Sequence, residues 1–420
     1  MKYIRRAIEN HLLKMFGQYK AVLVTGARQV GKSTMLNAVF SELSYVSLDD
    51  PWLEELAREQ SSMFMMMHPA PVIFDEIQRV PELFRMIKIA CDPSASYGLY
   101  CLSGAQAFHM MKGISESLSG RVAVLELSGL SMREIYGDDF DKPFIPTMQY
   151  LLDRKKTNMN AERMRLIWQI IHRGSYPELQ DSAKDWNGFY SNYLKTYLER
   201  DLRELSAVQD LDVFRRFMVS VAARTGEILN YSNIADEIGR DVKTIKNWIS
   251  LLETSGIIYL LEPYSANILK RAIKSPKLYM RDNGLACYLT RWLTPETLEN
   301  GAFRGHIFET FVISEILKSY VNCGIDYRYH VSYYRGRDKQ TDKATGIKSE
   351  SEIDLIIEEN GTLYPIEIKA SSHVTASETS AFMVLDKIPN KQRGMGAVVC
   401  MCPEPGMLRD NVLQIPVWYI

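Results

Sequence analysis

The stretch from residue 21 to residue 40 constrains the fold more than any other part of the 420-residue chain. A short β-branched run, AVLVT, is followed directly by GARQVGKS, which fits the pattern GxxxxGK[ST], and then by a helix-like segment. The two glycines let the backbone turn its N–H groups toward phosphate oxygens, and the start of the helix adds a positive dipole end. The pattern predicts a phosphate-binding loop between a strand and a helix.

The residue types in this loop indicate how a nucleoside triphosphate would be held. Lys32 is expected to reach the β and γ phosphates, and Ser33 to offer a hydroxyl to Mg²⁺. Further on, PVIFDE is an apolar strand that ends in two carboxylates, of which Asp75 would hold the metal through water and Glu76 would polarise the attacking water. ATP and Mg²⁺ are therefore the predicted cofactors. The predicted nucleotide-binding loop consists of Gly26, Ala27, Arg28, Gln29, Val30, Gly31, Lys32, Ser33 and Thr34.

Five apolar runs in residues 1–140 follow the order of a P-loop ATPase core, a parallel sheet with helices on both faces and one additional strand. After the first run, the others span residues 45–48, 72–74, 99–102 and 122–127. Ser103 and Gln106 follow the fourth run and are candidates for sensing the γ-phosphate, although a polar strand exit is equally common by chance. Arg121 enters the fifth run, where it is either a surface charge or a group that approaches a phosphate of its own or a neighbouring subunit.

Several longer strings identify a known family. GARQVGKST, VIFDEIQRVP, LSGAQ and SLSGRVAVLELSGLSMREI resemble the AAA-type ATPases of bacteria and archaea that carry a C-terminal domain of unknown function. The resemblance continues in RGSYPE, YLERDLREL and PKLYMRDNGLACYL, so it covers nearly the whole chain. It implies a winged helix and a nuclease-like fold in the second half.

The middle of the chain is expected to hold two units. Residues 141–225 begin with a segment rich in Lys, Asp, Pro, Thr and Asn and then become helical, which indicates a helical lid or linker. Arg200 and Arg203 lie in it one helical turn apart, either in solvated charge pairs or as lid arginines that act on ATP. Residues 226–290 show the helix, glycine-bearing turn and second helix of a winged helix-turn-helix.

The second helix of this unit has an apolar and a polar face. The face expected to point inward comprises Val242, Ile245, Ile249 and Leu252. The face expected to point outward, where it could enter a DNA major groove, comprises Lys243, Lys246, Asn247 and Ser250. A phosphate-contact patch is predicted from Lys270, Arg271, Lys274, Lys277 and Arg281. Winged helices also serve as protein-interaction or lid modules, so DNA contact is one of two interpretations.

Residues 291–420 contain a second group of candidate site residues. Two strands at 352–357 and 363–369 predict a hairpin, on which Glu367 and Lys369 point to the same face amid apolar neighbours. Together with Asp354 and the helical Glu309 they resemble the PD-(D/E)XK pattern of an α/β restriction-endonuclease-like domain. Asp354, Glu367 and Glu309 would then be Mg²⁺ ligands, and Lys369 would be catalytic by orienting a metal-bound water. A structural ion pair in a degenerate nuclease fold is the alternative.

Charge and hydropathy limit the possible binding partners and the location of the protein. The formal net charge is -1, so any affinity for nucleic acid must come from local patches. No apolar run reaches the ~18 to 20 residues of a membrane-spanning helix, and the charged first ten residues do not resemble a signal peptide, so a cytoplasmic protein is expected.

Two functions stay open: a nucleotide cycle that controls a DNA-binding and DNA-cleaving module, or a nucleotide-controlled switch whose nuclease-like fold is inactive. Self-association is a further expected partnership.

Overall fold

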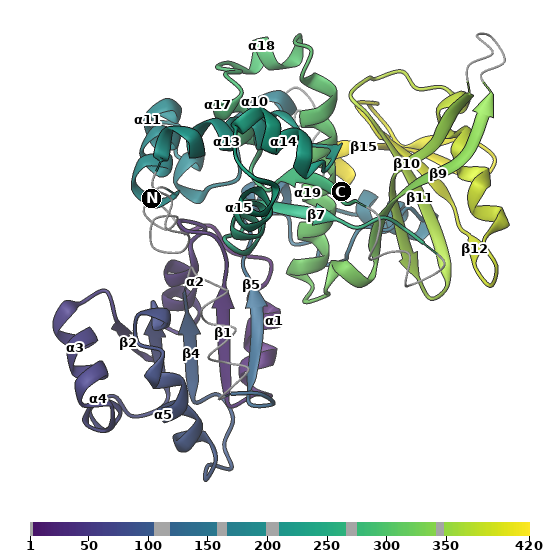
Figure 1. Ribbon diagram of the computed structural model, residues 1–420. Coiled ribbons are helices and arrows are strands. Elements are labelled where there is room, and N and C mark those ends of the chain that lie inside the picture. The colour runs from purple at the N-terminus through teal and green to yellow at the C-terminus, as the bar shows by residue number, and fades with distance from the viewer. Residues whose placement is uncertain (1–2, 105–117, 158–165, 199–209, 266–274, 342–347) are drawn as a thin grey trace.

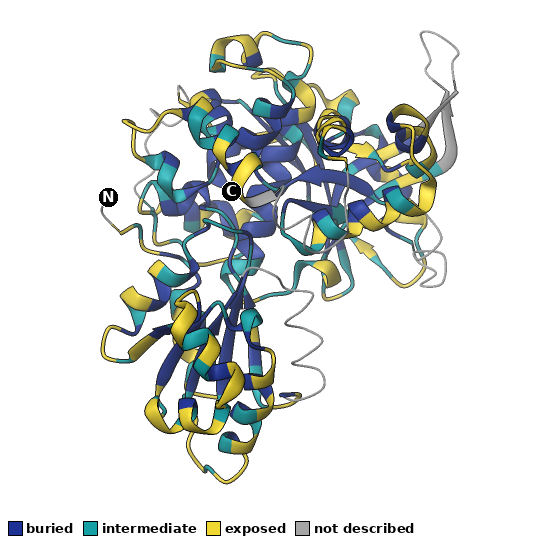
Figure 2. Ribbon diagram, turned by 60° about the vertical axis from the view of Figure 1, so that its left-hand side comes forward, coloured by how far each residue is buried: buried dark blue, intermediate teal, exposed yellow. Residues whose placement is uncertain are grey.

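The computed structural model describes residues 3–104, 118–157, 166–198, 210–265, 275–341 and 348–420 (Figure 1). An N-terminal α/β domain stands beneath a larger body of helices and sheets, and strands β1 and β5 point their carboxyl ends at that body (Figure 1). Buried residues concentrate in the strands and on the helix faces that cover them, while exposed residues follow the outer surfaces (Figure 2).

The N-terminal sheet is parallel and has the strand order β2-β3-β4-β1-β5. Its strands are β1 (Ala21–Thr25), β2 (Ser44–Ser47), β3 (Val72–Asp75), β4 (Tyr100–Ser103) and β5 (Val122–Glu126). The five predicted strands and their parallel sheet are confirmed, and in space β4 lies between β1 and β3. Every residue of β1 is buried because both faces of the sheet are covered.

The helices of this domain divide between the two faces of the sheet. They are α1 (Glu9–Phe16), α2 (Lys32–Val39), α3 (Pro51–Glu59), α4 (Ser61–Met67) and α5 (Glu82–Cys91). Val22 of β1 shares a core with Leu12 of α1 and Met35 of α2. Leu23, which points the other way, shares a second core with α4 and α5.

The segment after β5 ties the N-terminal domain to the C-terminal end of the chain. It contains α7 (Met132–Ile135) and α8 (Met148–Lys155), and is followed by α10 (Ile167–Arg173), the short 3-10 helix η2 (Pro177–Gln180) and α11 (Trp186–Tyr193). On α8, the fully buried Arg154 donates from Nε to the Tyr419 carbonyl at 3.0 Å. This part of the expected lid therefore packs against the C-terminal end of the chain.

A three-stranded sheet with three helices occupies residues 211–280. It comprises α13 (Leu211–Ala223), β6 (Glu227–Ile228), α14 (Tyr231–Ile238), α15 (Val242–Thr254), β7 (Ile258–Leu261) and β8 (Lys277–Met280), with strand order β6-β8-β7. Asp241 caps α15 by accepting from the Thr244 N–H. The expected inward face is corrected at one position, because Val242 is exposed and Trp248 is buried against Phe217, with ring centroids 5.1 Å apart.

The last part of the chain forms a second α/β unit. After α17 (Asn283–Leu289) and α18 (Pro295–Glu299), the long helix α19 (Arg304–Asn322) is followed by a sheet of order β14-β15-β13-β11-β10-β9. These strands are β9 (Val331–Thr341), β10 (Lys348–Glu359), β11 (Thr362–Lys369), β13 (Gly396–Cys400), β14 (Gly406–Arg409) and β15 (Val412–Pro416). The predicted hairpin is confirmed as the antiparallel pair β10–β11, in which Leu355 faces Ile366.

Candidate functional site

The phosphate-binding loop lies at the carboxyl end of β1. Gly26 has a φ of 145° and a side chain there would collide with the Leu127 carbonyl oxygen, at 2.2 Å from an added Cβ. Gly31, with a φ of 94°, precedes the first residue of α2 in the left-handed region. The buried Lys32 donates to the carbonyls of Gly26 and Ala27 at 3.0 and 2.8 Å. The ammonium group is therefore held within the loop.

Asp75, the last residue of β3, accepts hydrogen bonds from the hydroxyl groups of neighbouring elements. Ser33 Oγ donates to Asp75 Oδ2 at 2.8 Å, and the Ser103 hydroxyl at the end of β4 donates to Oδ1. Tyr45 of β2, which the sequence did not single out, donates to Oδ2 at 2.5 Å. Burial and the Asp75 carboxylate raise the pKa of Tyr45, so the phenol keeps its proton. The Ser33 and Asp75 oxygens fit a Mg²⁺ ion, which prefers hard oxygen ligands.

A cavity of about 550 Å³ opens beside the loop. Residues 28–34 line it together with Glu76, which adopts a φ of 56° directly after β3 and accepts from the Gln78 amide. Gly26 and Ala27 do not line this cavity, and Ala27 borders a smaller one behind the loop. On its other side the cavity is bordered by the N-terminal segment, by the segment after β5 and by η2. These walls contribute Tyr3, Ile4, Arg6, Leu130, Pro177 and Glu178.

Arg6 is a second residue that sequence reasoning missed. Its buried guanidinium donates to the Val30 carbonyl at 2.8 Å, to the Ser128 carbonyl at 2.7 Å and to Glu134 Oε1 at 2.9 Å. Three bonds in a fixed fork hold the loop against the segment after β5. Arg6 follows Arg5 near the start of the sequence and belongs to no motif that would have indicated this contact.

Of the alternatives for Arg121, the structure does not place it near the phosphate-binding loop of its own chain. Arg121 precedes β5, whose first residue pairs with Ala21 at the start of β1, whereas the phosphate-binding loop follows the end of β1. Its side chain forms an ion pair with Asp92 at 2.5 Å. Arg121 therefore lies at the amino-terminal end of the strands, whereas the phosphate-binding loop lies at their carboxyl end. Gln106, Arg200 and Arg203 lie outside the described residues.

In the C-terminal unit, the predicted polar residues of the hairpin lie together. Lys369 Nζ lies 2.9 Å from Glu367 Oε2 and 3.9 Å from Asp354 Oδ2. Asp354 Oδ2 also accepts the Ile368 backbone N–H at 2.9 Å. Burial and the nearby Asp354 charge raise the pKa of Glu367. Asp354 and Glu367 thus point to the same side of the hairpin.

Lys277 of β8 lies among the carboxylates of this cluster. Its ammonium is 2.7 Å from Glu352 Oε1, 3.3 Å from Glu309 Oε1 and 3.9 Å from Asp354 Oδ1. Burial and the Asp354 charge raise the pKa of Glu309 to about 7. We refer to Lys277, Glu309, Glu352, Asp354, Glu367 and Lys369 as the carboxylate cluster.

The structure does not present Asp354, Glu367 and Glu309 together as a ready set of metal ligands, and a site formed by Asp354 and Glu367 stays a prediction. Within the described ranges, no group of three or more His, Cys, Asp or Glu side chains is placed to hold a metal ion. Lys277 Nζ lies 3.3 Å from Glu309 and 3.9 Å from Asp354 and supplies positive charge to both carboxylates.

The predicted phosphate-contact patch is also corrected. Lys277 is buried in the carboxylate cluster, and Arg281 forms an ion pair with Glu126 at the end of β5. Lys270, Arg271 and Lys274 lie outside the described residues. The predicted outward face of α15 does hold, because all four of its polar residues are exposed: Lys243, Lys246, Asn247 and Ser250.

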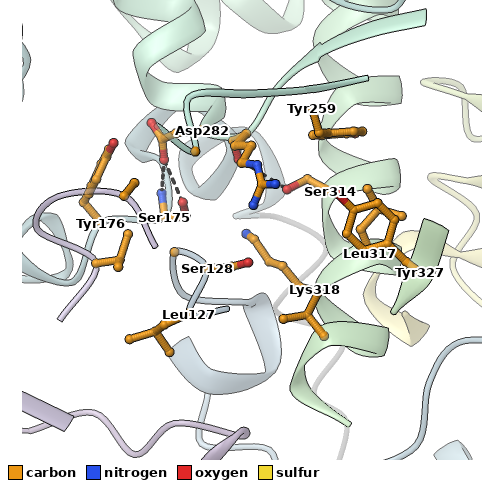
Figure 3. A pocket seen from close by; sticks show the side chains of 16 residues that line it. Leu127, Ser128, Ser175, Tyr176, Tyr259, Asp282, Ser314, Leu317, Lys318 and Tyr327 are labelled. Atoms are coloured by element: carbon orange, nitrogen blue, oxygen red, sulfur yellow. Dashed lines mark hydrogen bonds between the residues drawn. The ribbon is translucent and has the colours of Figure 1, made fainter. Parts of the chain in front are cut away.

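The two halves of the molecule meet behind the phosphate-binding loop. A cavity of about 40 Å³ there is lined by Ala27 of the loop, Ser175, Arg281 and Asp282, among others. Asp282 accepts hydrogen bonds from both the N–H and the hydroxyl of Ser175 at 2.7 Å (Figure 3). An added Cβ at Gly256, just before β7, would lie 3.3 Å from the Ala27 nitrogen, so the loop backbone contacts this half directly.

Comparison with known proteins supports part of this picture. Residues 18–136 match a family described as an AAA domain, and residues 164–296 and 304–420 match two domains of unknown function (DUF8612 and DUF4143). Uncharacterized proteins of Mycobacterium tuberculosis and Mycobacterium bovis are each 26% identical over 415 residues, which cover 98% of this chain and 83% of the relative. The N-terminal domain is therefore similar in sequence to AAA domains.

A solved structure of a Walker-type ATPase of Pyrococcus abyssi is similar over 67% of this chain and 94% of its own, with 14% identity and a TM-score of 0.38. None of the helices in the described part of the chain is both long and apolar enough to cross a membrane.

Proposed function

We propose that the protein binds and hydrolyses ATP in the N-terminal domain and that its nucleotide state controls DNA binding by the second half. The observation that carries the first part is the cluster of Lys32, Ser33, Asp75 and Glu76 at one end of the sheet, around a cavity lined by the loop. The observation that carries the second part is the exposed cationic face of α15.

Each residue of the nucleotide site has a distinct task in this proposal. Lys32 neutralises phosphate charge, and the backbone N–H groups of the loop bind phosphate oxygens. Ser33 and Asp75 would hold Mg²⁺, which would neutralise charge between the β and γ phosphates. Glu76 orients the attacking water, and Ser103 keeps Asp75 in place through its hydroxyl.

Residues 211–280 support the proposal of a winged helix. Their order of helix, strand, two helices and a two-stranded hairpin, with β8 between β6 and β7, is the order of that fold. Its second helix in the helix-turn-helix, α15, is the element that such proteins place in the major groove. The lysines of this face would neutralise phosphates at its edges.

For the nuclease-like unit, we favour DNA binding without cleavage over DNA cleavage. Lys277 already supplies the positive charge between Glu309 and Asp354 that a metal ion would otherwise supply. Cleavage is a second candidate, because Asp354, Glu367 and Lys369 do meet on one side of the hairpin. The proposed boundaries near 140 and 290 are supported by the extent of the matched families.

Incubation of the purified protein with supercoiled DNA, ATP and Mg²⁺ or Mn²⁺ separates these two candidates. Intact DNA, together with a mobility shift in gels, is the result that binding without cleavage predicts. Nicking or linearisation that Asp354→Asn abolishes, while ATP hydrolysis continues, would establish the nuclease and contradict our preference.

A further inference from the structure

Strand β8 reaches from the carboxylate cluster to the back of the phosphate-binding loop. Residues 277 and 279 share one face of β8 because side chains alternate along a strand, and Arg281 directly follows the last residue of the strand. Lys277 and Tyr279 both contact Glu309, at 3.3 and 2.6 Å, on the side of the cluster. Two residues further on, Arg281 pairs with Glu126, which is in register with Thr25 immediately before the loop.

Asp282 adds a second contact at this end. It accepts from Ser175, which lies two residues before Pro177, a residue that lines the nucleotide cavity (Figure 3). Asp282 also caps α17 by accepting the Leu285 N–H at 2.7 Å. Two adjacent residues, Arg281 and Asp282, therefore contact Glu126 and Ser175, which lie close in sequence or register to the phosphate-binding loop and to the cavity wall at Pro177.

Helix α19 spans the same two places beside β8. Glu309 belongs to the carboxylate cluster, whereas Glu315 accepts from the Met132 N–H at 2.7 Å and Lys318 donates to the Leu130 carbonyl at 2.9 Å. Nine residues of helix correspond to roughly 13.5 Å, and four residues of strand to roughly 13 Å. The hydroxyl of Ser314 donates to the Arg281 carbonyl at 3.3 Å and joins the two elements.

We propose that β8 and α19 form one coupling unit, through which nucleotide binding at the loop changes the contacts of Lys277 in the carboxylate cluster. This inference rests on the proposed ATP binding. Leu278 and Met280 on the opposite face of β8 are fully buried, so the strand is packed on both sides and transmits a displacement instead of absorbing it. Coupling between two sites acts in both directions, so a change in the contacts of Lys277 should in turn alter the nucleotide affinity.

The test measures the Kd of a non-hydrolysable ATP analogue with Mg²⁺ by calorimetry in four proteins. These are the wild type, Lys277→Met, Arg281→Gln and the double variant. We expect Lys277→Met to change the Kd at least fivefold although Lys277 does not line the nucleotide cavity. Lys277→Met should change the Kd less when it is added to Arg281→Gln than when it is added to the wild type, because β8 has then lost its contact with Glu126 and only α19 still connects the two places. Lys391→Met, which removes a half-buried ion pair with Glu358 in the C-terminal unit, is the control and should leave the Kd unchanged.

The coupling would be contradicted if folded Lys277→Met binds the ATP analogue with a Kd within twofold of wild type, or if the two substitutions have additive effects in the double variant. Neither result would contradict ATP binding at the loop. Absence of nucleotide binding by the wild type would overturn the proposed function as well. Circular dichroism verifies folding. If Lys277→Met does not fold, Lys277→Met combined with Glu309→Gln removes one charge of each sign, and the same fivefold criterion applies to it.

Discussion

At the residue scale, Asp75 shows which contacts a sequence can reveal. Ser33 and Asp75 belong to two motifs whose spacing predicts that they meet, and the structure places them 2.8 Å apart. Tyr45 donates to the same carboxylate, but it belongs to a short strand that no motif distinguishes. Motif residues were predictable because their chemistry fixes their pattern. Supporting residues were not, because many side chains could fill the same place.

The first prediction concerns Lys32. Replacing it with Ala removes the ammonium that faces the phosphates, and hydrogen bonds to charged groups contribute about 1.5–3 kcal/mol. We expect the Kd for ATP to rise roughly a hundredfold in calorimetry, since about 1.4 kcal/mol corresponds to a factor of ten. Lys14→Ala, at an exposed lysine of α1, should bind as the wild type does. Equal affinity in the Lys32 variant would show that the loop does not bind phosphates.

Glu76→Gln separates binding from hydrolysis. The amide retains the size of the side chain in the cavity but can no longer polarise water, and general bases contribute roughly 10²–10⁴ in rate. We expect ATP binding within threefold of wild type and phosphate release slower by roughly 10²-fold or more. Phosphate release that continues at the wild-type rate would assign the water-activating role to another residue.

At the element scale, the ion pair of Arg6 and Glu134 joins the N-terminal segment to α7. Burial raises the pKa of Glu134, but the Arg6 charge and the N–H groups of Ser131 and Ala7 outweigh it and hold the pKa below its usual value of 4.5. Because the folded state has the lower pKa, the stability from this pair is present above about pH 4.5 and is lost as the pH falls through the lower value.

Glu134→Gln should therefore lower the free energy of unfolding at pH 7 by about 3 kcal/mol, since it leaves a buried guanidinium unpaired. The difference from wild type should shrink in acid, as the wild type loses the same charge. Urea unfolding followed by circular dichroism at neutral and acidic pH measures both values. Glu54→Gln, at an exposed pair with Arg58, should cost less than about 1 kcal/mol. A difference that is constant with pH would contradict the assignment.

Helix α15 carries the prediction for DNA binding. Changing Lys243 and Lys246 to Gln should weaken binding to duplex DNA and lower the slope of log K against log salt, by about 0.9 for each phosphate that is no longer neutralised. Lys14→Gln combined with Lys155→Gln removes two exposed lysines from other helices and should leave the slope unchanged. An unchanged slope in the α15 variant would assign this unit to protein interaction.

Elements were predictable where the pattern is local, and misjudged where burial depends on distant partners. The five strands and the β10–β11 hairpin follow from short apolar runs and turns. Lys277 and Arg281 were expected at the surface because their neighbours in sequence are cationic. Their carboxylate partners are Glu309, Glu352 and Glu126, which are distant along the chain, so the sequence contains no local sign that both charges are neutralised inside the molecule.

At the scale of the whole molecule, the placement of the two halves was beyond sequence reasoning. The sequence indicates a nucleotide site near one end and a cluster of polar residues near the other, with no distance between them. The structure connects them through Arg281, Asp282 and α19, which contact the back of the phosphate-binding loop and the segment after β5. These contacts arise from packing between separate units, which no motif in either unit specifies.

The central claim is that nucleotide state controls DNA binding, and one measurement tests it most directly. Fluorescence anisotropy of a labelled DNA duplex is recorded while Glu76→Gln protein is added, once with ATP and Mg²⁺ and once without nucleotide. We predict that the two DNA affinities differ at least fivefold, and that the difference disappears when Lys32→Ala is added to Glu76→Gln. Equal DNA affinity with and without ATP, in a protein that calorimetry shows to bind ATP, would contradict the account.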